Sequence, residues 1–294
     1  MISEPSVDES WLPLPDDRVL VLGASGWFGT TFMDLTPRST PLLPVASSKR
    51  GIFEAWDDAT VLRFAPTVVV NFAALTLDQL PKLGLRQFTD TNQILADRML
   101  EVAQRASVRL VLTVSSGAAI TQPSGPYARI KAYEEARALS LANYHRQVIV
   151  LRAYSVSGPH VKRPHSYALP SFVLQAMRGR VMVEARHPTH RRYTSVRDLL
   201  MVGLKRGQAG WSGVIESGGE LVEMGELARR VVAVVNRDAV IERPTYYPDP
   251  VSTYASDNSS WIEACNQTGL VPENLETQIE RTAQGLMLNG FGQP

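Results

Sequence analysis

The amino-acid sequence predicts an α/β protein with a doubly wound parallel sheet and a smaller, partly interleaved lobe toward the C-terminus. Short apolar runs rich in β-branched residues recur in the first half of the 294-residue chain, as is typical of strands buried on both faces. Stretches with apolar residues three and four positions apart lie between the later runs and indicate helices. A glycine-rich turn directly follows the first run. Such an alternation is typical of a sheet that helices cover on both sides.

The strands expected of this sheet begin with residues 18–23, an apolar run that ends at a glycine. The later apolar runs occupy residues 41–46, 67–72, 109–114 and 147–152. Between the last three of these runs, helical spacing covers residues 87–106 and 127–145.

The second half of the chain has a different texture, because prolines interrupt it and the alternation of strand and helix becomes irregular. We therefore expect a flexible tail at residues 1–17, a sheet domain at 18–152 and a smaller lobe at 153–294. Some segments of this lobe are expected to return to the sheet. The helices expected in the lobe cover residues 167–178, 196–206, 220–235, 258–268 and 273–288.

The composition excludes several classes of protein. Hydrophobic residues make up 44% of the chain and the net charge is +1, which excludes a disordered chain and disfavours a nucleic-acid binder driven by bulk charge. Cys265 is the single cysteine, so no intrachain disulfide is expected. No apolar run is long enough to span a bilayer, and residues 1–17 lack the pattern of a signal peptide. We expect a cytoplasmic protein without a membrane or nucleic-acid partner.

The glycine turn predicts a dinucleotide site in a Rossmann-type sheet. Gly23, Gly26 and Gly29 follow the first strand and open an expected helix. Glycines at this spacing allow a tight turn, a close approach of the backbone to a pyrophosphate, and close packing of helix on strand. A turn that serves packing alone is the alternative. The residues at the helix N-terminus, whose amides face such phosphates, include Ser25, Trp27 and Phe28.

The end of the second strand indicates which dinucleotide is bound. A carboxylate there would bind the ribose 2′-hydroxyl of NAD, but residues 45–50 contain none. Hydroxyl and cationic side chains suit the 2′-phosphate of NADP, which we favour over NAD; a solvated loop is the alternative. Asp57 is either an adenine contact or an ordinary loop carboxylate. The candidate phosphate ligands are Ser47, Ser48, Lys49 and Arg50.

A tyrosine and a lysine four residues apart form the candidate catalytic pair. Tyr127 and Lys131 lie on the same face of an expected helix, and a fixed cation favours the phenolate form of a neighbouring tyrosine. Tyr127 is therefore a candidate proton donor or acceptor. Ser116 ends the fourth strand, where its hydroxyl would reach a substrate oxygen at the carboxyl edge of the sheet. Whether Ser115 takes this role instead is left open.

Together these motifs resemble the extended short-chain dehydrogenase/reductase family, which comprises NAD(P)-dependent sugar-nucleotide epimerases, reductases and dehydratases. The resemblance covers nearly the whole ordered chain and implies that Ser116, Tyr127 and Lys131 are its catalytic triad. Residues 191–198 are similar to a motif whose first arginine, here Arg191 or failing that Arg192, reaches the substrate diphosphate. The further cofactor residues that the resemblance implies are Ala73, Ala74, Asn92, Tyr154 and Val156.

The family resemblance implies hydride transfer between the nicotinamide and a sugar carbon, with proton transfer by Tyr127. Lys131 would hold the nicotinamide ribose, and Ser116 would polarise the substrate oxygen. The leading hypothesis is an NADP-dependent reductase of a nucleotide-activated keto-sugar. An NAD-dependent sugar-nucleotide epimerase and a non-catalytic protein that senses NADP are the alternatives.

Departures from the family pattern concern the substrate. Ser116 is followed by glycine and alanines, whereas family dehydratases carry acids there, so a dehydratase is not expected. Ser155, a candidate substrate contact, stands where many epimerases have asparagine. We expect no metal site, since His187 and His190 flank a proline and lack a carboxylate beside them. The helices over residues 87–106 and 127–145 resemble the pair through which family members dimerise, so a homodimer is expected.

Overall fold

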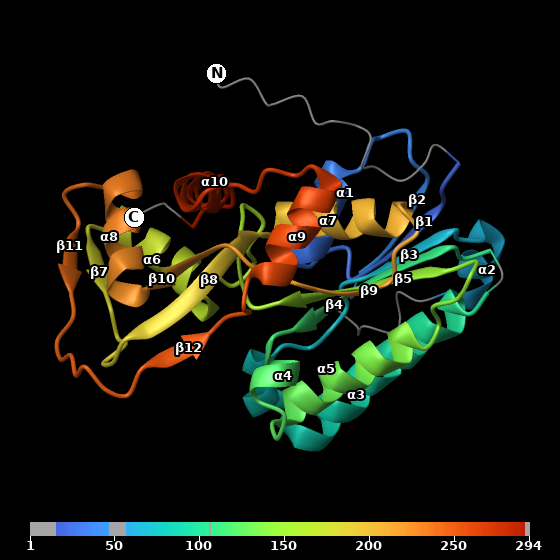
Figure 1. The fold of residues 1–294 in the computed structure, drawn as a ribbon, viewed down its shortest axis with the longest axis horizontal. Helices are drawn as coiled ribbons and strands as arrows, with labels where there is room; N and C mark the ends of the chain where they lie inside the picture. The colour runs from blue at the N-terminus through green and yellow to red at the C-terminus, as the bar shows by residue number, and fades with distance from the viewer. Residues whose placement is uncertain (1–15, 47–56, 106, 292–294) are drawn as a thin grey trace.

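In the computed structural model, which describes residues 16–46, 57–105 and 107–291, a parallel sheet and its helices form one lobe and a smaller group of strands and helices forms a second (Figure 1). The described part of this sheet has six strands in the order β2-β1-β3-β4-β5-β9, and every neighbouring pair is parallel. The α/β prediction is therefore confirmed. The strands are β1 (Val19–Leu22), β2 (Leu42–Val45), β3 (Val68–Asn71), β4 (Leu110–Ser116), β5 (Gln147–Ala153) and β9 (Gly213–Glu216).

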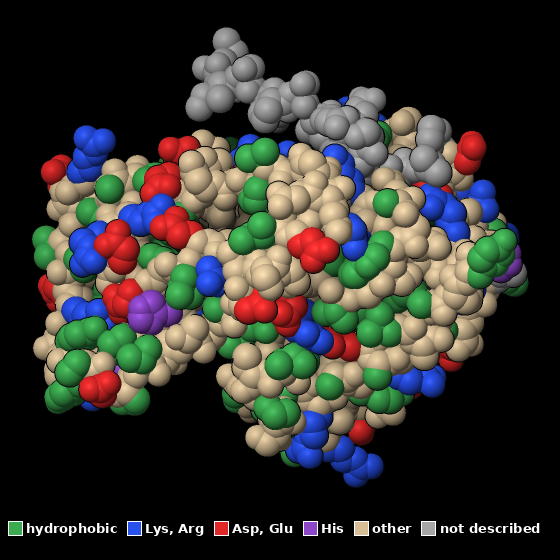
Figure 2. Space-filling view, in the orientation of Figure 1, with side chains coloured by type: hydrophobic (Ala, Val, Ile, Leu, Met, Phe, Trp, Pro, Cys, Tyr) green, Lys and Arg blue, Asp and Glu red, His purple; other side chains and the backbone are tan. Residues whose placement is uncertain are grey.

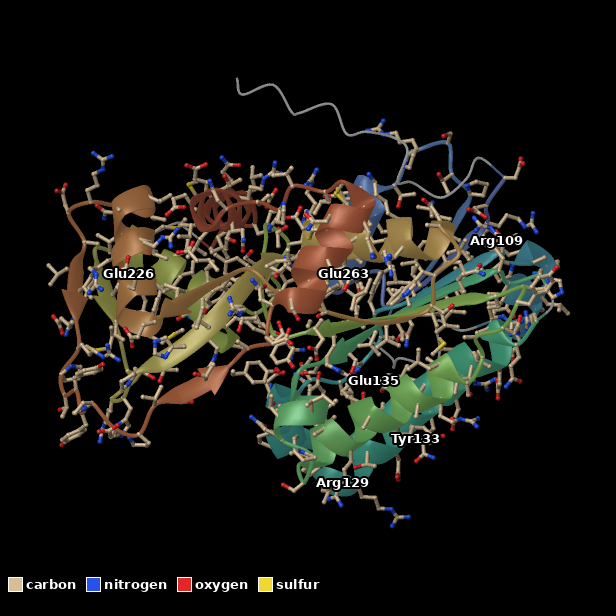
Figure 3. The ribbon with its side chains drawn as sticks, viewed as in Figure 1. Arg109, Arg129, Tyr133, Glu135, Glu226 and Glu263 are labelled. Atoms are coloured by element: carbon tan, nitrogen blue, oxygen red, sulfur yellow. The ribbon has the colours of Figure 1, made fainter. Side chains whose placement is uncertain are left out.

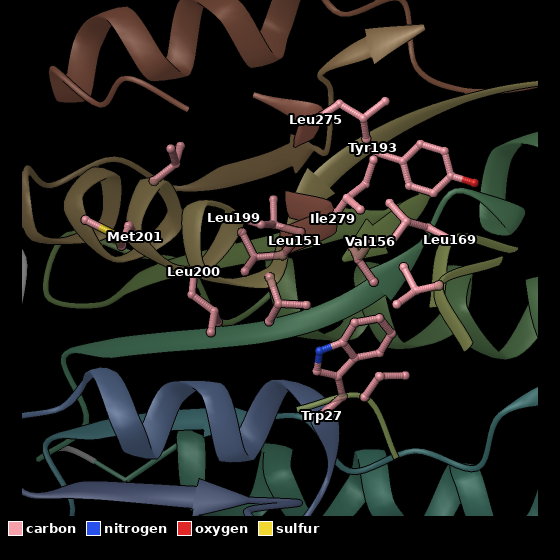
Figure 4. Close-up of a cluster of buried hydrophobic side chains, with 14 of the residues drawn as sticks. Trp27, Leu151, Val156, Leu169, Tyr193, Leu199, Leu200, Met201, Leu275 and Ile279 are labelled. Carbon is pink, nitrogen blue, oxygen red and sulfur yellow. The ribbon is translucent and has the colours of Figure 1, made fainter. Parts of the chain in front are cut away.

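Helices cover both faces of the sheet because its strands are apolar on both sides. Val19 and Val21 of β1 join the apolar cluster on one face, part of which is drawn in Figure 4, whereas Leu20 and Leu22 join the cluster on the other. The helices on the first face are α1 (Trp27–Leu35), α7 (Val196–Gln208) and α9 (Ser259–Thr268). Those on the second are α2 (Asp58–Phe64), α3 (Leu80–Ala103) and α5 (Pro126–Leu139).

The second lobe is built around the long strand β8 (Thr189–Ser195), which continues directly into α7 and so connects the lobe with the sheet. Beside it lie β6 (Ser155–Ser157), β10 (Glu220–Glu223) and β12 (Ser252–Tyr254). A separate pair consists of β7 (Arg180–Met182) and β11 (Val240–Glu242). The helices of the lobe are α6 (Ala168–Met177), α8 (Met224–Val235) and α10 (Leu275–Leu288), which pack against one another.

Three short helices complete the elements of the described residues. The 3₁₀ turn η2 (Leu77–Gln79) precedes α3, and η3 (Pro164–Ser166) precedes α6. The four-residue helix α4 (Ala118–Thr121) lies between β4 and α5. Among the residues that the structure describes, no helix is long and apolar enough to cross a membrane.

Several boundaries differ from those expected. The helix expected to reach residue 145 ends at Leu139, because Asn143 and Arg146 exchange backbone hydrogen bonds in a turn. The helix expected from residue 220 begins only at Met224, where the Glu223 carboxylate accepts a hydrogen bond from the amide of Gly225, and the residues before it form β10. Helical residues begin at Leu80, before the start expected at residue 87, but a kink at Gly84, whose φ is +73°, separates this first turn from the rest of α3.

Candidate functional site

A cavity of about 470 Å³ lies at the carboxyl edge of the sheet. The strand order reverses between β1 and β3, and ligands of doubly wound sheets bind where this reversal opens a crevice. In Figure 2 a notch separates the second lobe from the part of the first lobe that carries α4 and α5. The cavity wall includes the glycine turn, the ends of β2, β3 and β4, the first turns of α5 and the chain from β6 to Tyr167.

The glycine turn has no room for larger residues at two of its positions. Gly23 has a φ of +77°, and a Cβ on it would lie 2.6 Å from the amide nitrogen of Ala73. A Cβ on Gly29 would lie 2.2 Å from the carbonyl oxygen of Gly23. Helix α1 then begins at Trp27 without a side-chain cap, which leaves backbone amides at its N-terminus for an anion. These residues fit the diphosphate of a dinucleotide. Of the turn, Gly23, Ser25, Gly26, Trp27 and Phe28 line the cavity.

The structure does not describe the predicted phosphate ligands after β2, which are Ser47, Ser48, Lys49 and Arg50. Asp57 caps α2: its carboxylate accepts hydrogen bonds from the amides of Ala59 and Thr60, each at 3.1 Å. A hydrogen bond from the Thr60 hydroxyl is the main reason why the pKa of Asp57 is below its usual value. The sequence analysis missed a cation here, Arg98 of α3, which lines the cavity and lies 3.5 Å from Asp58.

The strand end after β3 forms the middle of the wall. The Asn71 side chain accepts a hydrogen bond from the amide of Ala73 at 3.1 Å, and Ala73 and Ala74 line the cavity. The predicted cofactor residue Asn92 is fully buried. Its side chain accepts from the amide of Leu75 at 2.8 Å and donates to the carbonyl oxygen of Phe88 at 3.1 Å. Asn92 thus lies behind the wall and shapes the loop that forms it.

Ser116, Tyr127 and Lys131 come together on one side of the cavity. Ser116 is the last residue of β4, while Tyr127 and Lys131 lie in the first two turns of α5 with the ammonium nitrogen 5.8 Å from the centre of the phenol ring. The Ser115 hydroxyl donates to the Glu135 carboxylate at 2.5 Å and is buried. This geometry favours Ser116 over Ser115 as the hydroxyl that meets a substrate.

Lys131 is held by two acceptors. Its ammonium donates to the Glu134 carboxylate at 2.7 Å and to the carbonyl oxygen of Val114 at 3.3 Å. Burial lowers the pKa of Lys131, but Glu134, Tyr127 and Glu135 together outweigh this effect and the pKa rises above its ordinary value. Lys131 therefore places a positive charge at the cavity wall.

Tyr254 of β12 reaches Ser116 from the second lobe. Its hydroxyl lies 3.2 Å from the Ser116 hydroxyl, and its ring centre lies 5.1 Å from that of Tyr154, which lines the cavity. Burial raises the pKa of the Tyr254 phenol, so it stays protonated at neutral pH. The sequence analysis missed Tyr254 because it stands in a proline-rich segment without a periodic pattern.

The predicted substrate residues occupy different places. The Arg191 guanidinium carbon lies 5.5 Å from the centre of the Tyr254 ring. Arg192 donates instead to the backbone carbonyl oxygens of Ser256 and Gly219, at 3.1 and 2.9 Å. Ser155 pairs in register with Tyr193 of β8, and only its neighbours Tyr154 and Val156 are among the described residues that line the cavity. Further lining residues without a prediction are Lys162, Arg163 and Tyr167.

No site for a metal ion is evident where the structure describes the chain. Within those residues, no group of three or more His, Cys, Asp and Glu side chains is arranged to hold a metal ion. The buried thiol of Cys265 lies on α9, and burial raises its pKa to about 12. Neither a metal-ligand cluster nor the buried thiol thus suggests a second site among the described residues.

Comparison with protein-family profiles identifies a matching family. The profile of the NAD dependent epimerase/dehydratase family matches residues 19–203. A search of curated protein sequences finds no match.

Solved structures with the same fold include a UDP-N-acetylglucosamine 4-epimerase from Methanobrevibacter ruminantium in complex with UDP-N-acetylmuramic acid. It is 18% identical, with a TM-score of 0.77 over 94% of this chain and 100% of that chain. A UDP-glucose 4-epimerase from Brucella ovis in complex with NAD is 19% identical, with a TM-score of 0.72 over 94% and 98%. RMD from Pseudomonas aeruginosa, complexed with NADPH, is 18% identical, with a TM-score of 0.70 over 93% and 99%.

Proposed function

Because the chain belongs to the NAD dependent epimerase/dehydratase family, we propose that it is an NADP-dependent oxidoreductase that reduces a nucleotide-activated keto-sugar. The observation that supports this proposal is that Ser116, Tyr127 and Lys131 line the same cavity as the glycine turn. A dinucleotide bound in this cavity could place its diphosphate at the amides of the glycine turn and its nicotinamide beside these three side chains.

The cofactor is held by the residues that line the cavity between these two ends. The amides at the start of α1 bind the diphosphate, and Lys131 binds the nicotinamide ribose. The nicotinamide, when bound, supplies the hydride for the carbonyl carbon of the substrate. Walls for the cofactor are formed by Ala73, Ala74, Tyr154 and Val156.

The protein's own residues handle the proton. Tyr127 donates it to the carbonyl oxygen of the substrate, which becomes the hydroxyl of the product. Ser116 donates a hydrogen bond to the same oxygen and polarises the carbonyl. The Lys131 ammonium favours the phenolate that remains on Tyr127, and solvent then returns the proton.

The preference for NADP is proposed from cations at the β2 end of the cavity. Arg98 lines the same cavity as Val45 and Ala46. Its Nη1 atom is paired with Asp58 and Glu101, at 3.5 and 3.2 Å, and we propose that the other side of the guanidinium donates to a phosphate. The predicted ligands on residues 47–50 would add further hydrogen bonds.

The substrate is proposed to enter between the lobes, with its carbonyl at Ser116 and its diphosphate near Arg191. Tyr254 lies between these two side chains, 3.2 Å from the Ser116 hydroxyl and beneath the Arg191 guanidinium. A neutral phenol between a hydroxyl and a cation suits a polar sugar ring attached to a diphosphate.

The proposal is tested by titrating apoprotein with NADPH and NADH and then screening nucleotide sugars by thermal shift. We expect NADPH to bind more tightly than NADH and at least one nucleotide sugar to raise the melting temperature further. Failure of both dinucleotides to bind would overturn the proposal.

A sugar-nucleotide epimerase is the second candidate, because two of the similar structures are named as epimerases. It would use the same side chains but retain its NAD through the cycle. Purified protein that carries tightly bound NAD and consumes no NADPH would favour the epimerase. For a non-catalytic sensor of NADP, the wild type and Tyr127→Phe would behave alike, because neither protein would turn over a substrate.

We also propose that α3 and α5 form the contact of a homodimer. The two helices lie side by side on one face of the sheet (Figure 1), and their outer surface exposes Leu85, Ile94 and Tyr133. Two such pairs would make a four-helix contact that covers these apolar side chains.

A further inference from the structure

The catalytic lysine has a buried counterion that the proposed chemistry does not use. Lys131 and Glu134 lie three residues apart on α5, with the ammonium nitrogen 2.7 Å from the carboxylate oxygen. Their side chains are only 4% and 5% exposed. A buried carboxylate without a partner is very unfavourable, so its presence beside Lys131 calls for a role.

The neighbouring acid cannot take the place of Glu134. Glu135 accepts hydrogen bonds from both ends of the Arg152 guanidinium, at 3.0 and 2.6 Å, and another from Ser115. Figure 3 shows Glu135 on the side of α5 that faces the sheet, with Arg129 on the outer side. The charge of Glu135 is thus balanced by Arg152, whereas that of Glu134 is balanced by Lys131.

We propose that Glu134 is a positioning residue, which keeps the buried Lys131 ammonium charged and directs one of its N–H groups into the cofactor cavity. An ammonium has three N–H donors. In the part of the chain that the structure describes, Glu134 and the carbonyl oxygen of Val114 accept two of them. The third is left for the cavity, which Lys131 lines.

The charge balance around Lys131 explains why the counterion is needed. Burial favours the neutral amine, and Glu134 is the strongest of the charged groups that oppose burial. Tyr127 and Glu135 on the same helix oppose it less, and β4 contributes only the Val114 carbonyl. Without Glu134, burial would lower the pKa of Lys131, and the ammonium would lose its proton at a lower pH than in the wild type.

The protonation of Lys131 can be measured directly because the chain has only five lysines. Protein labelled with ¹³C-lysine is titrated by NMR, and the Lys131 signal is assigned by its loss in Lys131→Arg. We expect a midpoint above 10.5 in the wild type and a lower midpoint in Glu134→Gln, because burial is then opposed by less negative charge. A wild-type midpoint below 10.5, or a change of less than about half a unit in the variant, would overturn the proposal.

The matched control is Glu226→Gln on α8. Glu226 forms an ion pair with Arg229, also three residues apart and with a separation of 2.6 Å, but both side chains are exposed. This substitution removes the same charge and leaves the Lys131 midpoint unchanged if the effect is local. If Glu134→Gln does not fold, the wild-type titration still tests the first part of the proposal, which is that the buried Lys131 stays charged.

The second part, direction of the N–H group, rests on the proposed function. NADPH affinity of Glu134→Gln is expected to start falling at a lower pH than that of the wild type, in each protein at the Lys131 midpoint that NMR gives. Equal pH dependence in both proteins would overturn this part. If neither protein binds a dinucleotide, the proposed function fails, but the lysine titration still decides whether Glu134 keeps Lys131 charged.

Discussion

Gly29→Ala is expected to damage both the fold and the cofactor site. An alanine inside a helix ordinarily stabilises it by about 1 kcal/mol relative to glycine. Here the added Cβ would lie 2.2 Å from the Gly23 carbonyl oxygen and 2.7 and 2.8 Å from backbone atoms of Ala24. Normal contact requires about 3.4 Å, so α1 and the turn have to separate by roughly 1 Å. Overpacking of this kind costs about 3 kcal/mol, which leaves a net loss of about 2 kcal/mol.

That loss corresponds to a melting temperature roughly 3–4 °C lower for a chain of 294 residues. NADPH affinity is expected to fall at least tenfold, because the displaced amides are those that face the diphosphate. Thermal unfolding and fluorescence titration with NADPH measure the two effects. Gly179→Ala is the control: Gly179 has a φ of +84° with nothing within 4 Å of an added Cβ, so it loses about 1 kcal/mol of stability and no affinity. Wild-type stability and affinity in Gly29→Ala would refute this reasoning.

Four further predictions follow from particular side chains. Arg98→Gln weakens NADPH binding but not NADH binding in parallel titrations; equal loss would refute a phosphate contact. Cys265, with a pKa of about 12, stays unreactive toward a thiol reagent at pH 8 until the protein is unfolded. Burial lowers the pKa of His160 below its ordinary 6.5, so the unfolded chain binds the proton first and stability falls as the pH drops from 7 to 5. Denaturant titrations at both pH values measure the fall in unfolding free energy, which is expected to be smaller in His160→Gln than in the wild type. Light scattering at micromolar concentration gives a dimer mass for the wild type and a monomer mass for Ile94→Glu, and a monomeric wild type would refute the proposed contact.

The sheet was predictable because burial on both faces leaves an unmistakable apolar pattern. β1 consists of valine and leucine alone, and β3 consists of three valines followed by Asn71. The pair Tyr127 and Lys131 was visible for a similar reason, since helical spacing alone places both on one face. The local sequence around these residues is therefore enough to predict where they lie in the fold.

The second lobe was harder to predict because its strands are short and polar. β8 contains two arginines and a histidine, and its residues look like a loop until β10 and β12 are seen beside it. Tyr254 meets Ser116 across 138 positions of sequence, a distance that no local pattern encodes. Helical spacing likewise allows Glu134 to meet Lys131, but only packing against the sheet shows that both are buried.

The central claim, reduction by NADPH with Tyr127 as proton donor, is tested most directly by following NADPH absorbance with a panel of nucleotide keto-sugars. We expect stoichiometric NADPH oxidation with at least one substrate by the wild type, and a rate at least a hundredfold lower for Tyr127→Phe. No oxidation with any member of the panel, together with NAD that stays bound through purification, would contradict it.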